Sequence, residues 1–139
     1  MVDIDSCRIL DFQNQIDERG GLVIAEAFKE IPFEIRRVFY SFNIPDRQFR
    51  GAHAHKRCHQ VLIAPSGRFT VEIDDGISKK RIVMDNPLKG LYVPPGIWAS
   101  ELEFEPGAIC LVLASDNYVE SDYIRSYDDF LKMRKINEM

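Results

Sequence analysis

Hydrophobic and polar residues alternate along most of this chain in short runs, as in half-buried β-strands; Val71-Glu72-Ile73 is one example. Turn-forming residues separate the runs, as in Pro65-Ser66-Gly67 and Glu105-Pro106-Gly107. The expected strands are Leu22 to Ala27, Ile35 to Asn43, His59 to Ala64, Phe69 to Asp74, Lys80 to Met84, Gly90 to Val93 and Ala108 to Ala114. This spacing predicts an all-β fold, an antiparallel sandwich or barrel.

The last part of the chain has a helical period instead. Tyr127, Phe130, Leu131 and Arg134 recur at helical spacing, after a capping pattern that begins at Ser126. We expect a short C-terminal helix packed outside the barrel. Because 139 residues with 45% hydrophobic content can bury one core, and no linker divides the chain, residues 1–139 are predicted to form a single domain.

Charge and composition narrow the possible partners. The net charge is −4 and no segment is dominated by Lys or Arg, so we expect neither nucleic acid nor a membrane surface as a partner. The first twelve residues lack the apolar run of a signal peptide, and no apolar stretch is long enough to span a bilayer, which predicts a soluble cytoplasmic protein. Cys7, Cys58 and Cys110 are widely spaced and are expected to be small buried residues rather than disulfide partners.

The candidate chemistry centres on the segment Arg50-Gly51-Ala52-His53-Ala54-His55-Lys56. Alternation along a strand places His53 and His55 on the same side, where they face one pocket. Arg50 and Lys56 add positive charge, which favours neutral imidazoles that can act as bases and would also suit a phosphate. His59 follows a segment that turns or bulges, and we expect it to be structural.

The same segment resembles a cupin metal site with an incomplete ligand set. Gln60 stands where the cupin pattern has a glutamate, and Ala99, after Pro94-Pro95-Gly96, stands where it has a final histidine. Only His53 and His55 remain as good ligands, whereas transition metals in such sites need three or more imidazole or carboxylate groups. We therefore predict no metal and no cofactor, with the histidine pair used for proton transfer.

Other residues are candidates for binding a phosphorylated sugar. Alternation across Arg36-Arg37-Val38-Phe39-Tyr40 turns one arginine inward whichever face is buried; this would provide a fork for a diphosphate, with Tyr40 near a sugar. Tyr92 and Trp98 are candidates to stack on a sugar or base, although lone aromatic residues are also common in cores. The chain has no Walker or dinucleotide glycine loop and no G-x-S-x-G elbow, which disfavours nucleotide hydrolysis, hydride transfer and serine chemistry.

Several segments match a known family in order along nearly the whole chain: Asp17-Glu18-Arg19-Gly20, Ile31-Pro32-Phe33, the Arg50 to Lys56 segment, Gly90-Leu91-Tyr92-Val93, Leu113-Ala114-Ser115-Asp116 and Asp122-Tyr123-Ile124-Arg125. Together they resemble the nucleotide-sugar 3,4-ketoisomerases. This resemblance implies a homodimeric cupin jelly roll without a catalytic metal, which moves the ketone of dTDP-4-keto-6-deoxy-D-glucose from C4 to C3. A pyridoxal-phosphate aminotransferase would use the product, on the way to amino sugars of surface polysaccharides such as O-antigen and S-layer glycans.

The resemblance also implies roles for individual residues. His53 and His55 would carry the proton transfers through an enediol, and His53 is favoured at carbon. The substrate-binding candidates are Arg19, Arg37, Tyr40, Arg50, Lys56, Gln60, Tyr92 and Trp98. Three alternatives stay open: a sugar-nucleotide 3,5-epimerase, a cupin ligand-binding or sensor module without chemistry, and a metal-dependent dioxygenase.

Overall fold

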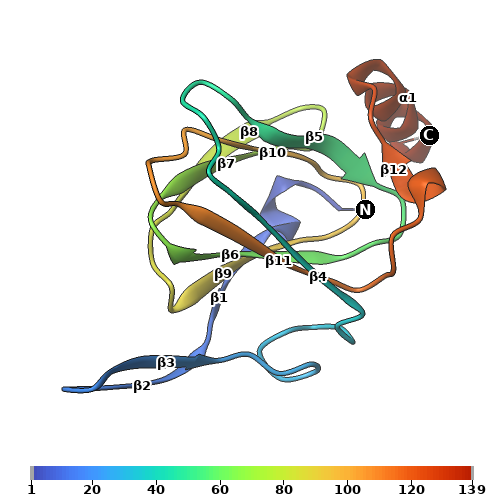
Figure 1. The fold of residues 1–139 in the computed structure, drawn as a ribbon. Coiled ribbons are helices and arrows are strands. Elements are labelled where there is room, and N and C mark those ends of the chain that lie inside the picture. Colours follow the sequence, from blue (N-terminus) through green and yellow to red (C-terminus); the bar gives the residue numbers. More distant parts are fainter. Residues whose placement is uncertain (1, 139) are drawn as a thin grey trace.

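The computed structural model describes residues 2–138, and its centre is a barrel of two antiparallel five-stranded sheets (Figure 1). The first sheet has the order β1-β9-β6-β11-β4 and the second has the order β12-β5-β10-β7-β8. Their strands are β1 (Arg8–Asp11), β4 (Arg37–Phe42), β5 (Arg50–His55), β6 (Gln60–Ser66), β7 (Phe69–Asp74), β8 (Lys79–Met84), β9 (Lys89–Val93), β10 (Trp98–Leu102), β11 (Ile109–Ala114) and β12 (Tyr123–Ile124). The predicted antiparallel all-β architecture is confirmed.

Most strands lie within a few residues of their predicted positions, and β7 has the predicted bounds. The expected strands did not include β1, β2, β10 or β12. The sequence of β10, Trp-Ala-Ser-Glu-Leu, contains no β-branched residue. This strand lies between β5 and β7 and is hydrogen-bonded to both. Pairing on its two edges, rather than intrinsic propensity, therefore accounts for its conformation.

Side chains from both sheets fill the space inside the barrel. Leu62, Phe69, Val71 and Leu91 are at most 2% exposed in the main core cluster. Burying each such side chain contributes about 1.5–3 kcal/mol relative to leaving it in water. Two of the three thiols, Cys58 and Cys110, are buried as expected and all three are free; Cys7 is only partly buried.

The helix α1 (Tyr127–Glu138) packs on the outside of the second sheet, as predicted (Figure 1). Its Phe130 is fully buried, and the Ser126 hydroxyl caps the helix by accepting a hydrogen bond of 3.3 Å from the Asp129 N–H. Trp98 of β10 packs against it from the barrel side. Within residues 2–138, no helix has the length and apolar character needed to cross a membrane.

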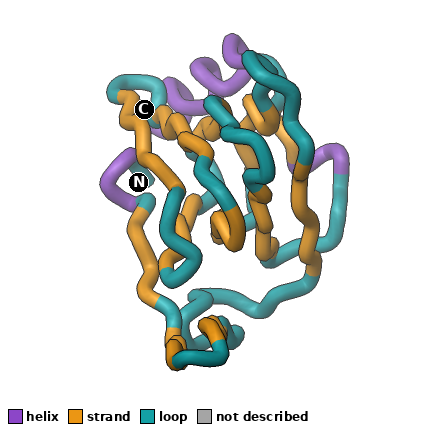
Figure 2. The backbone as a smooth tube through the Cα atoms, turned by 60° about the vertical axis from the view of Figure 1, so that its left-hand side comes forward, coloured by secondary structure: helices purple, strands orange, loops and turns teal. Residues whose placement is uncertain are grey.

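The amino-terminal part has a different arrangement. After the short 3-10 helix η1 (Ile4–Ser6) and β1, strands β2 (Gln13–Asp17) and β3 (Gly20–Ile24) form a separate two-stranded hairpin. This hairpin stands away from the barrel in both views (Figures 1 and 2). The chain then returns, and Ile31 and Phe33 pack with Phe12 in a second cluster that includes Val61 of the first sheet.

Candidate active site

A cavity of about 380 Å³ opens into the barrel between the two sheets. Its walls come from β4, β5, β6, β10 and β11 and from the segment that carries β12. The polar and charged residues in these walls are Tyr40, Ser41, Arg50, His53, Gln60, Glu101, Tyr123 and Arg125. Four of them, Tyr40, Arg50, His53 and Gln60, were predicted from the sequence as site residues.

Strand β5 carries both candidate histidines, His53 and His55. Gly51 and Ala52 have φ values of 78° and 61°, and the register with β10 shifts at this point, so Ala52 forms a bulge. Beyond the bulge, His53 lies opposite Ala99 of β10 and His55 lies opposite Tyr123 of β12. The imidazole rings meet edge to face with centroids 4.9 Å apart, which confirms that the pair shares one side of the strand.

Both imidazoles are held in the neutral form. Burial, followed by the neighbouring His55, lowers the pKa of His53 to about 4. Burial also lowers the pKa of His55, and this outweighs the opposite effect of Asp122. The positive charges of Arg37 and Arg125 lower both pKa values further. The sequence had suggested Arg50 and Lys56 for this role. Lys56 instead lines a separate hollow, whereas Arg125 follows β12, which pairs with β5.

Asp122 orients His55 from the outer side of the pair. Its carboxylate oxygen Oδ2 lies 2.9 Å from His55 Nδ1, and the N–H groups of Arg57 and Cys58 donate to its two oxygens. Burial would raise the pKa of Asp122, but these hydrogen bonds together lower it, so the carboxylate is ionised. An ionised acceptor at Nδ1 places the His55 proton there and leaves Nε2 unprotonated.

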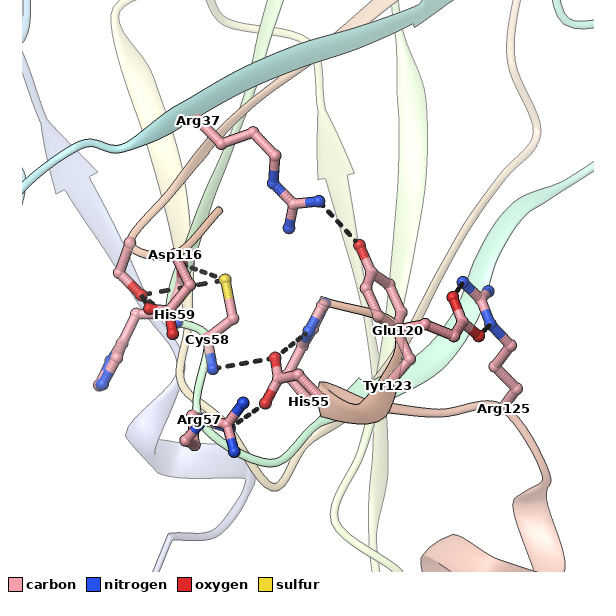
Figure 3. Close-up of polar contacts among 11 residues, drawn as sticks. Arg37, His55, Arg57, Cys58, His59, Asp116, Glu120, Tyr123 and Arg125 are labelled. Atoms are coloured by element: carbon pink, nitrogen blue, oxygen red, sulfur yellow. Dashed lines mark hydrogen bonds and ion pairs between the residues drawn. The ribbon is translucent and has the colours of Figure 1, made fainter. Parts of the chain in front are cut away.

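Tyr123 covers the histidine pair and links it to two arginines. Its ring centroid lies 4.9 Å from that of His53 and 4.4 Å from that of His55. Its hydroxyl accepts a hydrogen bond of 3.1 Å from Arg37, as Figure 3 shows. The guanidinium of Arg125 stacks 4.4 Å from the same ring and is paired with Glu120 (Figure 3). Two guanidinium groups therefore lie beside the ring that covers the imidazoles, where they can attract an anionic ligand.

The donor set does not match the cupin metal site. Ala99, opposite His53, offers only a methyl group, and the side chain of Gln60 offers only an amide. Among the described residues, His55, Cys58 and Asp122 bring potential ligand atoms within 4.8 Å of one another. The Asp122 oxygens in this group already accept three hydrogen bonds, so the cluster is explained as the network that orients His55.

We expect turnover to be unchanged after dialysis against EDTA, because the residues at the cupin ligand positions supply two good ligands instead of four. The measurement is the initial rate before and after chelation, together with metal analysis of the active protein. A reversible loss of rate that one specific ion restores would contradict this expectation.

Comparison with known proteins agrees with the geometry of the site. The sequence profile of the FdtA family, described as "WxcM-like, C-terminal", matches residues 5–135. The chain belongs to the FdtA family. A curated relative, the TDP-4-oxo-6-deoxy-alpha-D-glucose-3,4-oxoisomerase of Aneurinibacillus thermoaerophilus, is 45% identical over 131 residues, which cover 94% of each chain.

Solved structures resemble nearly the whole FdtA-family chain. A 3,4-ketoisomerase from Helicobacter canadensis is 43% identical with a TM-score of 0.90, covering 93% of this chain and 97% of that one. A mutant 3,4-ketoisomerase from Thermoanaerobacterium thermosaccharolyticum, solved with TDP-4-keto-6-deoxyglucose, is 35% identical with a TM-score of 0.92 and covers 94% of each chain. A Mycobacterium tuberculosis epimerase at 16% identity and a TM-score of 0.74 shares the fold alone. The predicted cupin jelly roll is confirmed.

Several predicted binding residues do not reach the cavity. Lys56 lines a separate hollow beside α1, and Arg19 is exposed on the β2–β3 hairpin, paired with Asp17 at 2.7 Å. The Tyr92 hydroxyl contacts His59 in the second cluster, and Trp98 packs on Tyr127 and Phe130. Within the single chain these four side chains therefore lie outside the cavity, and their roles in substrate binding stay predictions. For Tyr92 and Trp98, other segments of the chain cover the faces on which they lie.

The structure also brings in residues that had no predicted role. Sequence analysis used Asp122, Tyr123 and Arg125 only as part of a segment that resembles the family. A run of charged and aromatic residues just before a helix could itself have marked them as candidate site residues. Glu101 was missed entirely. It lies two residues after Ala99 on β10, so strand alternation places it on the side that was already assigned to the pocket.

Proposed function

We propose that this protein is a 3,4-ketoisomerase acting on a TDP-linked 4-keto-6-deoxy sugar. The observation that carries the proposal is the pair of neutral imidazoles, His53 in the cavity wall and His55 against it. Arg50 and Arg125 line the same cavity, and Arg37 donates to the hydroxyl of Tyr123 in its wall. The curated relative bears the name of this activity, and a structural relative was solved with TDP-4-keto-6-deoxyglucose. The three arginines suit the diphosphate of such a substrate.

The proposed chemistry uses bases rather than a Lewis acid. A ketone at C4 acidifies the hydrogen on C3, and an imidazole whose pKa is near 4 is fully unprotonated at neutral pH. His53 is the base at carbon, because it lines the cavity directly. His55 is the second imidazole of the transfer and is held in one tautomer by Asp122. Tyr40, Arg50 and Gln60 bind the sugar and diphosphate from the cavity walls.

The test is product analysis with dTDP-4-keto-6-deoxy-D-glucose. Carbon NMR should show the carbonyl moving from C4 to C3. An epimerase would leave the carbonyl at C4 and invert a ring carbon, and a binding module would leave the sugar unchanged and would not exchange the C3 hydrogen with solvent. Either result would reject the proposal.

We further propose that the protein is a homodimer in which the amino-terminal hairpin takes part. All five residues of β2 are exposed, as are the apolar side chains of Ile16 (64%) and Leu22 (55%) on the hairpin. The edge strand β4 of the first sheet also exposes Val38 and Phe42. Apolar strands left uncovered in this way favour pairing with a second copy of the chain.

Sedimentation of the wild type at micromolar concentration should give the mass of a dimer. The variant Leu22→Asp should dissociate, because a carboxylate on the hairpin would have to be buried without a partner. Ile77→Asp, which changes an exposed apolar residue in the loop between β7 and β8, should remain dimeric. A monomeric wild type would refute the homodimer.

From the family resemblance we also propose that the protein acts in the cytoplasm and that a pyridoxal-phosphate aminotransferase uses its 3-keto product. The resulting amino sugar would enter surface glycans. A coupled assay with such an aminotransferase, followed by identification of the amino sugar, tests the use of the product by the aminotransferase.

A further inference from the structure

Moving a ketone between neighbouring carbons requires four proton transfers, two at carbon and two at oxygen. On the proposed function, on which this inference rests, a proton leaves C3 and another arrives at C4, while O4 gains a proton and O3 loses one. The imidazoles suit the carbon side, because both are neutral and His55 already donates its one N–H proton to Asp122. Neither is a ready acid for O4, so the oxygen side needs another group.

Glu101 is the carboxyl group of the cavity, and the strands place it beside the histidines. On β10 it lies opposite Arg50, and its neighbour Ala99 lies opposite His53. Its side chain extends over Gly51: a Cβ atom at Gly51 would lie 2.1 Å from Glu101 Oε2. Gly51 therefore leaves the space that the carboxyl occupies. The Glu101 side chain and the His53 imidazole both line the cavity, so one bound sugar ring can contact both groups.

The surroundings of Glu101 favour its uncharged form at neutral pH. Burial raises its pKa to about 8, and the hydrogen bond to its own backbone and the charge of Arg50 offset this only in part. On the β7 side its partner is the apolar Val71. Cys110 on β11 is also near and is itself a neutral thiol, because burial raises its pKa well above the ordinary value. The other titratable or charged groups of the cavity are Tyr40, His53, Tyr123 and Arg125.

We propose that Glu101 is the proton shuttle between the two oxygens of the reacting sugar. One carboxyl oxygen gives its proton to O4 as His53 removes the C3 hydrogen, and the enediol forms. The resulting carboxylate then takes the proton from the O3 hydroxyl as the imidazolium returns a proton to C4. The C4 carbonyl becomes a hydroxyl, the C3 hydroxyl becomes a carbonyl, and both protein groups regain their initial protonation.

A carboxylic acid is the side chain suited to this task. It offers a donor and an acceptor on two adjacent oxygens, and O3 and O4 sit on adjacent carbons, so one group serves both without moving far. The imidazole pair, Arg50 and Gln60 do not combine a transferable acidic proton with a second acceptor of this kind. Glu101 would act as a catalytic residue, because it exchanges protons with the substrate directly.

The test is the isosteric variant Glu101→Gln, which retains the shape and a hydrogen-bond donor but cannot transfer a proton. We expect kcat to fall about 100-fold or more with KM within a few-fold of wild type. In the wild type, kcat/KM should decline above pH 8 as Glu101 ionises, and this alkaline decline should be absent from the variant's residual activity. Glu103→Gln, which changes an exposed carboxylate two residues further along the chain, should behave as wild type in both respects.

A second measurement does not depend on turnover. The infrared difference spectrum between wild type and Glu101→Gln should contain a protonated-carboxyl band at pH 7 that disappears at pH 9, while melting and TDP binding show that the variant is folded. A fully active variant, a retained alkaline decline or an ionised carboxylate at pH 7 would each overturn this inference while leaving the ketoisomerase activity intact. A wild type that moves no ketone would instead overturn both proposals.

Discussion

Replacing His53 with alanine is expected to lower kcat by about 100-fold or more, the lower range of general acid and base contributions. The variant loses the base that faces the cavity, whereas the arginines that suit the diphosphate stay in place. Binding of TDP, measured by calorimetry, should therefore remain close to wild type. His59→Ala is the matched control, because that imidazole contacts Tyr92 and Phe33 outside the cavity and should leave kcat unchanged.

The pair should also behave as one unit. If His53 and His55 serve the same sequence of proton transfers, the double alanine variant should be scarcely slower than the poorer single variant. In deuterated water, the wild type should place solvent deuterium on the ring at C3 or C4, and the double variant should not. A double variant with wild-type turnover would mean that the pair is only structural.

The second large effect is expected for Asp122→Asn. The carboxylate accepts hydrogen bonds from His55 and from the N–H groups of Arg57 and Cys58, and an amide has one acceptor oxygen for these three donors. Its NH₂ group would face either a donor or His55 Nδ1, where it would favour the opposite tautomer. We expect kcat to fall about 100-fold and the free energy of unfolding to fall by about 1–3 kcal/mol.

The stability effect has a defined pH dependence. The pKa of Asp122 in the folded protein lies below its ordinary value of 3.8, so its contribution to stability is present above pH 3.8 and is lost as the pH falls through the lowered pKa. Urea unfolding should thus separate wild type and variant clearly at pH 7 and less at pH 3. Asp85→Asn, at an exposed site after β8, is the control and should match wild type at both values. An equal difference at pH 7 and pH 3 would contradict a role for the ionised carboxylate.

Local sequence predicted the elements well where apolar residues recur at the period of a strand or helix. Strand β7 has its predicted bounds because Phe69, Val71 and Ile73 alternate with more polar residues, and this two-residue period is a local property. The shared side of His53 and His55 follows from the same period. The helix α1 was predictable because its apolar residues and its Ser126 cap lie within one short segment.

The sequence also determined what chemistry the cupin positions can support. Gln60 and Ala99 can be identified by their spacing from the histidine pair, and each removes a metal ligand whatever the details of the fold. Side-chain identity at a motif position is a local fact, so no tertiary information was needed for it.

Tertiary structure alone decided which distant residues complete the site. Asp122 lies 67 residues from His55, and Tyr123 lies 86 residues from the arginine that donates to its hydroxyl. Their meeting depends on the pairing of β12 with β5, which only the closed barrel establishes. Likewise, alternation places Tyr92 and Trp98 on definite faces of their strands, but the segments that cover those faces come from elsewhere in the chain. Strand parity is a property of neighbouring residues, whereas burial of a face and the pKa of Glu101 depend on what the whole chain packs against it.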